Sequence, residues 1–399
     1  MKLTFDNSAS SENLTNFPTL VHLTSTHSNF WSHINSSITK NNTKDLRFVD
    51  ADDSTELYFE AEKINYAGED ALVWVKVPQI DAGSTTDFIY VYYGNSGADQ
   101  SSYHNASNVW DSNFKMVQHL EETSGTHYDS TSNDNDGTPQ GSLNQNATGQ
   151  IDGADDFDGS DDWVNCGEGS GTLDFGTGDF TLEAWVKTTE TNTRHIVAKS
   201  GYIYGMAQYT LQINSGKLKA TLHDGTNHNL GNGSTTINDD SWHHIVVSFD
   251  RDANATYFVD GTNDKETDIS TFTGSVSNNY PLRLAEDPKL MDPVFFNGDI
   301  DEVRVSNAAR SGDWIEACYL NTKDNSTFLT YGSSEPPIPV GGTIYPINKA
   351  AVLAPWLCLT ITLASALAIG TLHLRQHQAQ KASSNELRGE NNEICKAPK

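Results

Sequence analysis

Basic residues are scarce in this chain. It has 25 lysines and arginines against 53 aspartates and glutamates, which gives a formal net charge of −28 at pH 7. So acidic a surface repels the phosphates of DNA and RNA, and we expect no nucleic-acid partner. The charge suits solubility in salt or the binding of divalent cations.

Cysteine is nearly absent, with four in 399 residues. Cys358 and Cys395 lie near the end of the chain, and Cys166 and Cys318 are the pair that an oxidising compartment would join. Because the sequence gives no distance between those two, a Cys166–Cys318 disulfide and two buried free thiols both stay open.

Motifs of the common catalytic sites are missing. The chain has no Gly-x-Ser-x-Gly nucleophile turn, no His-Glu-x-x-His zinc helix and no phosphate-binding loop. His243 and His244 are adjacent, but neighbouring residues of a strand point to opposite faces and cannot ligate one metal together. We therefore expect no enzyme.

Sustained helical periodicity is also absent outside one apolar run near the C-terminus. Short alternating runs broken by Gly, Asn, Asp and Ser dominate, as in all-β proteins. In residues 180–187 alternate apolar side chains share one face, and residues 211–222 form a hairpin around a glycine-containing turn. The pattern predicts a small β-sandwich domain at residues 1–110 and a larger β domain at residues 113–332.

The exceptional apolar run covers residues 350–374 and contains no charged residue. About 20 such residues suffice to span a bilayer as a helix, so we expect one transmembrane helix rather than a buried core helix. Positive charge after the run places residues 375–399 in the cytoplasm and the rest outside, as in a single-pass protein of the cell membrane. Residues 333–349 are rich in proline and glycine, and this composition predicts a semi-stiff stalk.

The sequence features related to export from the cell do not agree with one another. Residues 1–6 enter polar sequence without an apolar core or a cleavage site. We expect the native start to lie upstream, and the alternative is that the C-terminal helix itself directs insertion. The acceptor pattern Asn-x-Ser/Thr, typical of a glycoprotein, occurs only before the apolar run. The acceptors are Asn13, Asn35, Asn41, Asn105, Asn146, Asn232, Asn254 and Asn325.

Four sequence blocks follow one another along the larger domain: residues 153–164, 180–186, 241–261 and 296–305. In this order they resemble the concanavalin A-like, laminin-G-type jelly roll. The resemblance implies an antiparallel jelly-roll sandwich. Residues 13–21 and 90–95 are similar to a small β domain of unknown function that precedes such jelly rolls in prokaryotic surface proteins.

The same resemblance implies a bound calcium ion where the first and last strands of the jelly roll meet. It points to Asp158 and Asp301, with Asp299 as a further candidate. Calcium takes six to eight oxygen ligands, and residues 152–162 hold the densest group of carboxylates in the chain. The alternative is a solvated acidic loop.

Aromatic side chains are the remaining candidates for a ligand site. Tyr202, Tyr204 and Tyr209 lie on or beside the expected hairpin and are suited to stack on sugar rings, with a role in the core as the alternative.

The pair of acidic residues that a jelly-roll glycosidase needs for catalysis is incomplete in this chain. Jelly-roll glycosidases of the laminarinase type resemble one another in a Glu-x-Asp-x-x-Glu strand. Here Glu266 and Asp268 are followed by Thr271 where the second glutamate belongs.

These observations predict a membrane-anchored cell-surface protein that binds a glycan or another surface protein. A polysaccharide hydrolase or lyase and a non-binding structural spacer are the alternatives, since a fold class alone names no ligand.

Overall fold

The computed structural model describes residues 1–167, 171–201, 207–287, 294–324 and 327–334, and residues 1–336 form one compact unit. The predicted membrane run at 350–374, the tail at 375–399 and nearly all of the predicted stalk lie outside these residues. Within the described part, no helix has both the length and the apolar character needed to cross a bilayer.

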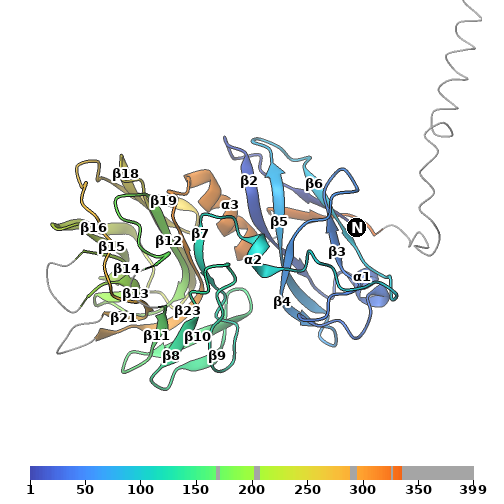
Figure 1. Ribbon diagram of the computed structural model, residues 1–399, viewed down its shortest axis with the longest axis horizontal. Helices are drawn as coiled ribbons and strands as arrows, with labels where there is room; N and C mark the ends of the chain where they lie inside the picture. The colour runs from blue at the N-terminus through green and yellow to red at the C-terminus, as the bar shows by residue number, and fades with distance from the viewer. Residues whose placement is uncertain (168–170, 202–206, 288–293, 325–326, 335–399) are drawn as a thin grey trace, which may run out of the picture. The chain divides into compact units, whose positions relative to one another are not determined.

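An N-terminal sandwich is built from two antiparallel sheets (Figure 1). Strands β2, β5 and β4 form the three-stranded sheet, and its central strand β5 is buried along most of its length. Short helix α1 (Ser28–His33) lies between β2 and β3, and short helix α2 (Ala106–Val109) lies between β6 and β7. The three-stranded order is β2 (Leu14–Leu23), β5 (Asp70–Ile80), β4 (Phe59–Asn65), and the four-stranded order is β24 (Leu329–Tyr331), β1 (Lys2–Phe5), β6 (Phe88–Tyr92), β3 (Arg47–Val49).

Strand β24 corrects the expected domain boundaries. It follows the jelly roll in the sequence and falls in the range expected for that domain, 113–332, yet it pairs with β1 through Leu3↔Tyr331 and Phe5↔Leu329. Phe328 and Leu329 are buried in the same apolar cluster as the N-terminal strands. The N-terminal sandwich therefore contains both ends of the described chain.

The larger domain is an antiparallel jelly roll of two stacked sheets, as predicted. One sheet runs β19 (Thr262–Asp268), β18 (Asn254–Val259), β17 (Trp242–Phe249), β12 (Phe180–Lys187), β23 (Asn297–Ser306), β10 (Gly153–Asp158), β9 (Asn144–Thr148), with β7 (Phe114–Gln118) also on β23. The other runs β16 (Asn227–Thr236), β15 (Lys217–His223), β14 (Gln208–Asn214), β13 (Arg194–Lys199), β20 (Leu282–Leu284), β11 (Trp163–Cys166), β8 (Gly137–Gln140). Short strands β21 (Glu286–Asp287) and β22 (Val294–Phe295) pair with each other.

Alternation of side chains explains the jelly-roll core. The predicted apolar face of β12 lies in the core cluster, which also receives alternate residues of β17 and β18. The predicted hairpin is β14–β15, where Ser215 and Gly216 make the turn with positive φ angles of 54° and 69°. Glycine adopts such angles without steric cost.

Helix α3 (Gly312–Lys323) follows β23 and covers part of the other face of the β12 sheet. Ser311 caps the helix by accepting a hydrogen bond from the Trp314 amide. Cys318 and other buried residues of α3 belong to the N-terminal apolar cluster, and Asn321 exchanges two hydrogen bonds with the backbone of Leu20. The helix thus ties the two β domains together within one compact unit.

Candidate functional site

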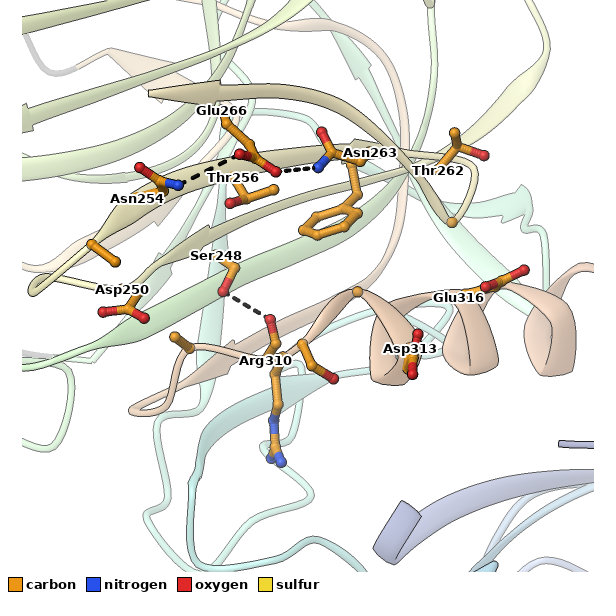
Figure 2. A pocket seen from close by; sticks show the side chains of 16 residues that line it. Ser248, Asp250, Asn254, Thr256, Thr262, Asn263, Glu266, Arg310, Asp313 and Glu316 are labelled. Atoms are coloured by element: carbon orange, nitrogen blue, oxygen red, sulfur yellow. Dashed lines mark hydrogen bonds between the residues drawn. The ribbon is translucent and has the colours of Figure 1, made fainter. Parts of the chain in front are cut away.

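A groove of about 700 Å³ lies between strands β17–β19 and the start of α3. We call it the α3 groove. Figure 2 shows side chains of β18 and β19 facing those of the loop and helix that follow β23. Its polar lining includes Asp250, Asn254, Thr256, Thr262, Asn263, Glu266, Asp313 and Glu316.

The register of two strands creates one wall of this groove. Ala255, Tyr257 and Val259 point into the jelly-roll core, so the alternate residues of β18 face outward. Thr256 pairs with Glu266 across the strands, and the two side chains therefore share a face. In the sequence, this wall appears only as the polar residues of an ordinary alternating strand. Such a pattern does not by itself indicate a binding site.

Glu266 is held by two amides. Asn263 Nδ2 donates to Glu266 Oε1 at 2.7 Å, and Asn254 Nδ2 lies 3.5 Å from Glu266 Oε2. For the side chains of Thr256, Thr262 and Glu316, the described part of the chain supplies no hydrogen-bond partner. The groove thus offers free hydroxyl and carboxylate groups beside an ordered carboxylate.

The groove is acidic. Asp250, Glu266, Asp313 and Glu316 line it, whereas the guanidinium of Arg310 turns away and binds Asp111 at 3.1 Å. Asp313 Oδ2 accepts hydrogen bonds from the Ser11 amide and hydroxyl, both at 2.7 Å, and these bonds lower the pKa of Asp313. Asp313 therefore stays ionised at neutral pH.

Tyr209 was predicted to bind a ligand, and that prediction is wrong. Its side chain is fully buried in the jelly-roll core, and its hydroxyl donates to the Leu173 carbonyl at 2.8 Å. A sugar ring has no access to it, and the predicted alternative of a core role holds. Tyr202 and Tyr204 lie outside the described residues.

The predicted meeting of the first and last jelly-roll strands is confirmed, because β10 pairs with β23. The predicted calcium ligands nevertheless do not converge. Asp158 pairs with Asn297, four residues before Asp301, which corresponds to about 13 Å of strand. Asp299 faces Lys187 at 3.2 Å, and Asp301 is buried with Oδ2 accepting from the Gln150 and Ile151 amides.

Asp158 instead meets two other carboxylates. Ligand atoms of Asp158, Asp161 and Asp162 lie within 4.8 Å of one another in the β10–β11 loop. Asp162 is buried, which raises its pKa, and its Oδ1 accepts from the Ser142 amide at 2.8 Å. This loop is the part of the predicted acidic cluster that can offer several oxygens to a cation.

Of the two alternatives for the cysteines, the structure shows the free thiols and no disulfide between Cys166 and Cys318. Cys166 and Cys318 are both buried free thiols, one in the jelly-roll core and the other in the N-terminal cluster. Burial raises the pKa of each thiol, so both remain protonated at neutral pH. They act as small apolar side chains.

Two family models match separate parts of the chain. Residues 158–316 match the model of the concanavalin A-like lectin/glucanases superfamily, and residues 42–135 match a domain of unknown function (DUF2341). The chain therefore carries a concanavalin A-like jelly-roll domain preceded by a domain of unknown function. No curated protein matches it.

Several solved structures are similar to this chain at low levels. The binding domain of Paraclostridial Mosquitocidal Protein 1 is 14% identical with a TM-score of 0.44, covering 52% of each chain. A botulinum neurotoxin type C structure, titled for cell entry dependent upon two ganglioside molecules, is 12% identical with a TM-score of 0.41, covering 53% of this chain and 51% of that one. The chain thus spans about half the length of these structures, and likenesses at such TM-scores carry no argument about function.

Proposed function

We propose that this protein is a non-catalytic binding protein whose jelly roll recognises a neutral, hydroxyl-rich glycan in the α3 groove. The observation that carries the proposal is the lining of that groove. Carboxylate, amide and hydroxyl groups from β18, β19 and α3 converge on one open volume. Sugar hydroxyls donate to carboxylate and amide oxygens, and such a ligand site needs only a few placed polar groups.

The charge of the groove narrows the ligand class. Its carboxylates repel sulfate and uronic acid groups, which favours uncharged sugars or a positively charged segment of a surface protein. The neutral glycan is preferred because Thr256 and Thr262 add hydroxyls that can both donate and accept.

N-glycosylation of Asn254, one of the predicted modifications, would compete with glycan binding in the α3 groove. Asn254 belongs to an Asn-x-Ser/Thr acceptor and lines the groove. A glycan attached there would occupy the space that the proposed ligand needs. The proposal therefore requires that Asn254 is unmodified in the protein that binds, which mass spectrometry of the peptide containing Asn254 checks.

We also propose that residues 350–374 anchor the protein in the cell membrane, with residues 333–349 as the stalk. The support is the uncharged length of the run. Fractionation of cells expressing the full chain should place it with membranes, and a chain ending at residue 334 should leave that fraction. Recovery of the full chain away from membranes contradicts the anchor.

A structural calcium ion is proposed for the acidic loop of Asp158, Asp161 and Asp162. Their three carboxylates supply part of the six to eight oxygens that calcium takes. Calorimetric titration of the full chain with calcium should show one site that Asp161→Asn weakens. Equal heats for the wild type and Asp161→Asn contradict this site.

The first test of the function is a glycan array probed with the full chain, in calcium and then in chelator. Specific binding to neutral glycans supports the proposal, and its loss on chelation adds the acidic loop to the binding mechanism. Binding restricted to acidic glycans contradicts the proposed groove, and an absence of all glycan binding shifts the function to a protein partner or a spacer.

A further inference from the structure

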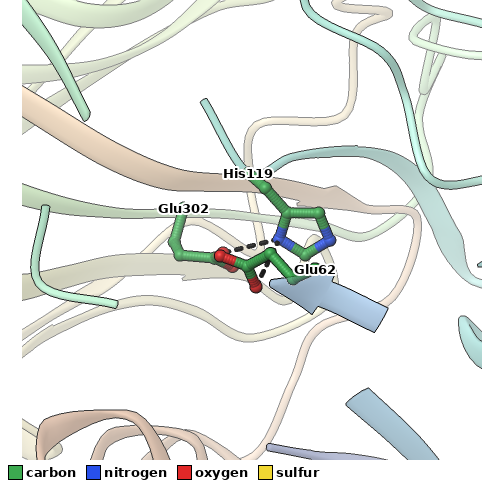
Figure 3. A group of neighbouring side chains, drawn as sticks. All are labelled: Glu62, His119 and Glu302. Atoms are coloured by element: carbon green, nitrogen blue, oxygen red, sulfur yellow. Dashed lines mark hydrogen bonds and ion pairs between the residues drawn. The ribbon is translucent and has the colours of Figure 1, made fainter. Parts of the chain in front are cut away.

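A second cluster of ionisable groups lies where the N-terminal sandwich meets the jelly roll. Figure 3 shows Glu62 of β4, Glu302 of β23 and His119, which follows β7. His119 Nδ1 lies 2.5 Å from Glu302 Oε1 and 3.5 Å from Glu62 Oε2. The side chains of all three are nearly inaccessible, with exposed fractions of 6%, 1% and 0% for His119, Glu62 and Glu302.

Each member of this cluster is oriented by a further donor or acceptor. Trp74 Nε1 donates to Glu62 Oε2 at 2.6 Å, and Arg304 Nη2 donates to Glu302 Oε2 at 2.6 Å. His119 Nε2 lies 3.5 Å from Glu60 Oε2 on the far side of the ring. Metal-binding histidines commonly donate their second ring N–H to a carboxylate, and ligating carboxylates are hydrogen-bonded in turn.

One oxygen in the cluster is left without a partner. Glu62 Oε1 is buried and accepts no hydrogen bond from the described residues. A buried carboxylate oxygen without a donor costs free energy comparable to a lost charged hydrogen bond. This orphaned atom belongs to a residue whose other oxygen already faces His119, and it points to a missing positive partner.

Negative charge is in excess around the cluster. The carboxylates of Glu60, Glu62, Asp301 and Glu302 are all buried or nearly so and outnumber the cationic partners Arg304 and His119. Buried carboxylates in such excess must take up protons or bind a cation.

The backbone at Glu302 is strained in a way that serves the cluster. Glu302 has a φ of 53°, and the β12–β23 register shifts there, so that β23 carries one extra residue. A side chain other than glycine rarely adopts this angle. The bulge keeps Ile300 and Val303 in the jelly-roll core while Glu302 faces His119.

We propose that Glu62, His119 and Glu302 form a binding site for one divalent transition-metal ion of the Zn²⁺ or Mn²⁺ class that joins the two β domains. His119 Nδ1 and one oxygen from each glutamate are the ligands, and Glu60 Oε2 faces the remaining ring nitrogen of His119 at 3.5 Å. The imidazole ligand suits Zn²⁺ and the two carboxylates also suit Mn²⁺, whereas Ca²⁺ takes oxygen ligands alone. The site is separate from the acidic loop and does not depend on the proposed function.

Because the site is buried, metal must enter as the domains assemble, and its binding contributes to folding. The test unfolds the full chain in chelator, refolds it with Zn²⁺, Mn²⁺ or Ca²⁺, and measures bound metal by mass spectrometry after desalting. We expect about one Zn²⁺ or Mn²⁺ per chain, a raised melting temperature and no retained Ca²⁺ at this site. Wild-type protein that refolds without retaining Zn²⁺ or Mn²⁺ overturns the proposal.

Variants separate this site from other acidic groups. Glu62→Gln keeps the shape of the side chain and should weaken metal binding on the order of 100-fold, since even outer partners contribute 10–100-fold. Glu183→Gln is the matched control, because Glu183 is a buried partner of Arg304 that does not contact His119. Asp161→Asn tests the acidic loop. Loss of the metal from Asp161→Asn together with its retention by Glu62→Gln would contradict the assignment. If Glu62→Gln does not fold, the metal content of the refolded wild-type protein tests the proposal.

Discussion

Arg304 is the residue on which the buried ion network depends. Its guanidinium donates to Glu302 and lies 3.2 Å from Glu183, and it stacks 4.6 Å from the centre of the Trp74 ring. Removing one partner of a buried pair leaves an uncompensated charge. We expect Arg304→Met to lower the free energy of unfolding by about 3–5 kcal/mol in urea titrations.

Arg194 provides the control for that measurement. It pairs with Glu190 at 3.2 Å, but the ion pair is partly exposed. Arg194→Met should therefore cost no more than about 1 kcal/mol. If Arg304→Met lowers the free energy of unfolding no more than Arg194→Met does, the buried network does not stabilise the fold.

His127 should make stability depend on pH. It lies between Glu122 and Asp155, with ring nitrogens 3.0 Å from each carboxylate. Burial alone would lower the pKa of His127, but these two partners raise it to about 9. The protonated ring therefore contributes stability that is complete below about pH 6.5 and is lost as the pH rises through about 9.

The measurement compares the free energy of unfolding at about pH 6 and about pH 10 for the wild type and for His127→Gln. The wild type should lose roughly 3 kcal/mol more than the variant over this range. Subtracting the variant removes the contribution of His119, which titrates in both proteins. The same pH dependence in both would refute the role of His127.

The two described cysteines should behave as unreactive thiols. Cys166 and Cys318 are buried and free. Alkylation without reductant should leave both unmodified in native protein and label both after denaturation. Mass spectrometry of the labelled peptides detects this, and a Cys166–Cys318 cross-linked peptide would contradict the structure.

Single residues were the hardest feature to predict from the sequence. Tyr209 was assigned to a site by residue type and Asp301 by the family resemblance, yet both are buried, and backbone groups bind the Tyr209 hydroxyl and Asp301 Oδ2. Strand alternation indicates which residues share a face but not what covers that face.

At the scale of elements, β24 and α3 make the N-terminal sandwich dependent on distant sequence. Asn321 of α3 bonds to the Leu20 backbone, and β24 completes the sheet beside β1. The jelly-roll strands were predictable from their period of two, but a three-residue strand such as β24 gives too short a pattern.

A fragment of residues 1–110 should therefore fail to fold alone. Without β24 and α3, strand β1 loses a neighbour and the apolar cluster loses Trp314, Phe328 and other members. Circular dichroism and urea titration of the fragment should show no cooperative transition. A chain of residues 1–334, which keeps both elements, is the control and should unfold cooperatively. A stable 1–110 fragment contradicts this interdependence.

At the scale of the whole molecule, the acidic composition and the jelly roll lead to the same expectation. A chain of net charge −28 with one acidic groove is suited to a ligand without negative charge. The sequence predicted the fold class. It did not predict the α3 groove, because its two walls are about 50 residues apart and meet only when α3 packs beside β18 and β19.

The most direct test of the proposed function measures the affinity of the full chain for its best neutral glycan from the array. Glu266→Lys reverses a charge on the groove wall, and Asp99→Lys makes the same change at an exposed residue outside the groove lining. We expect Glu266→Lys to weaken binding at least tenfold, about 1.4 kcal/mol, while Asp99→Lys leaves it unchanged. Unchanged affinity in Glu266→Lys would contradict recognition in the α3 groove.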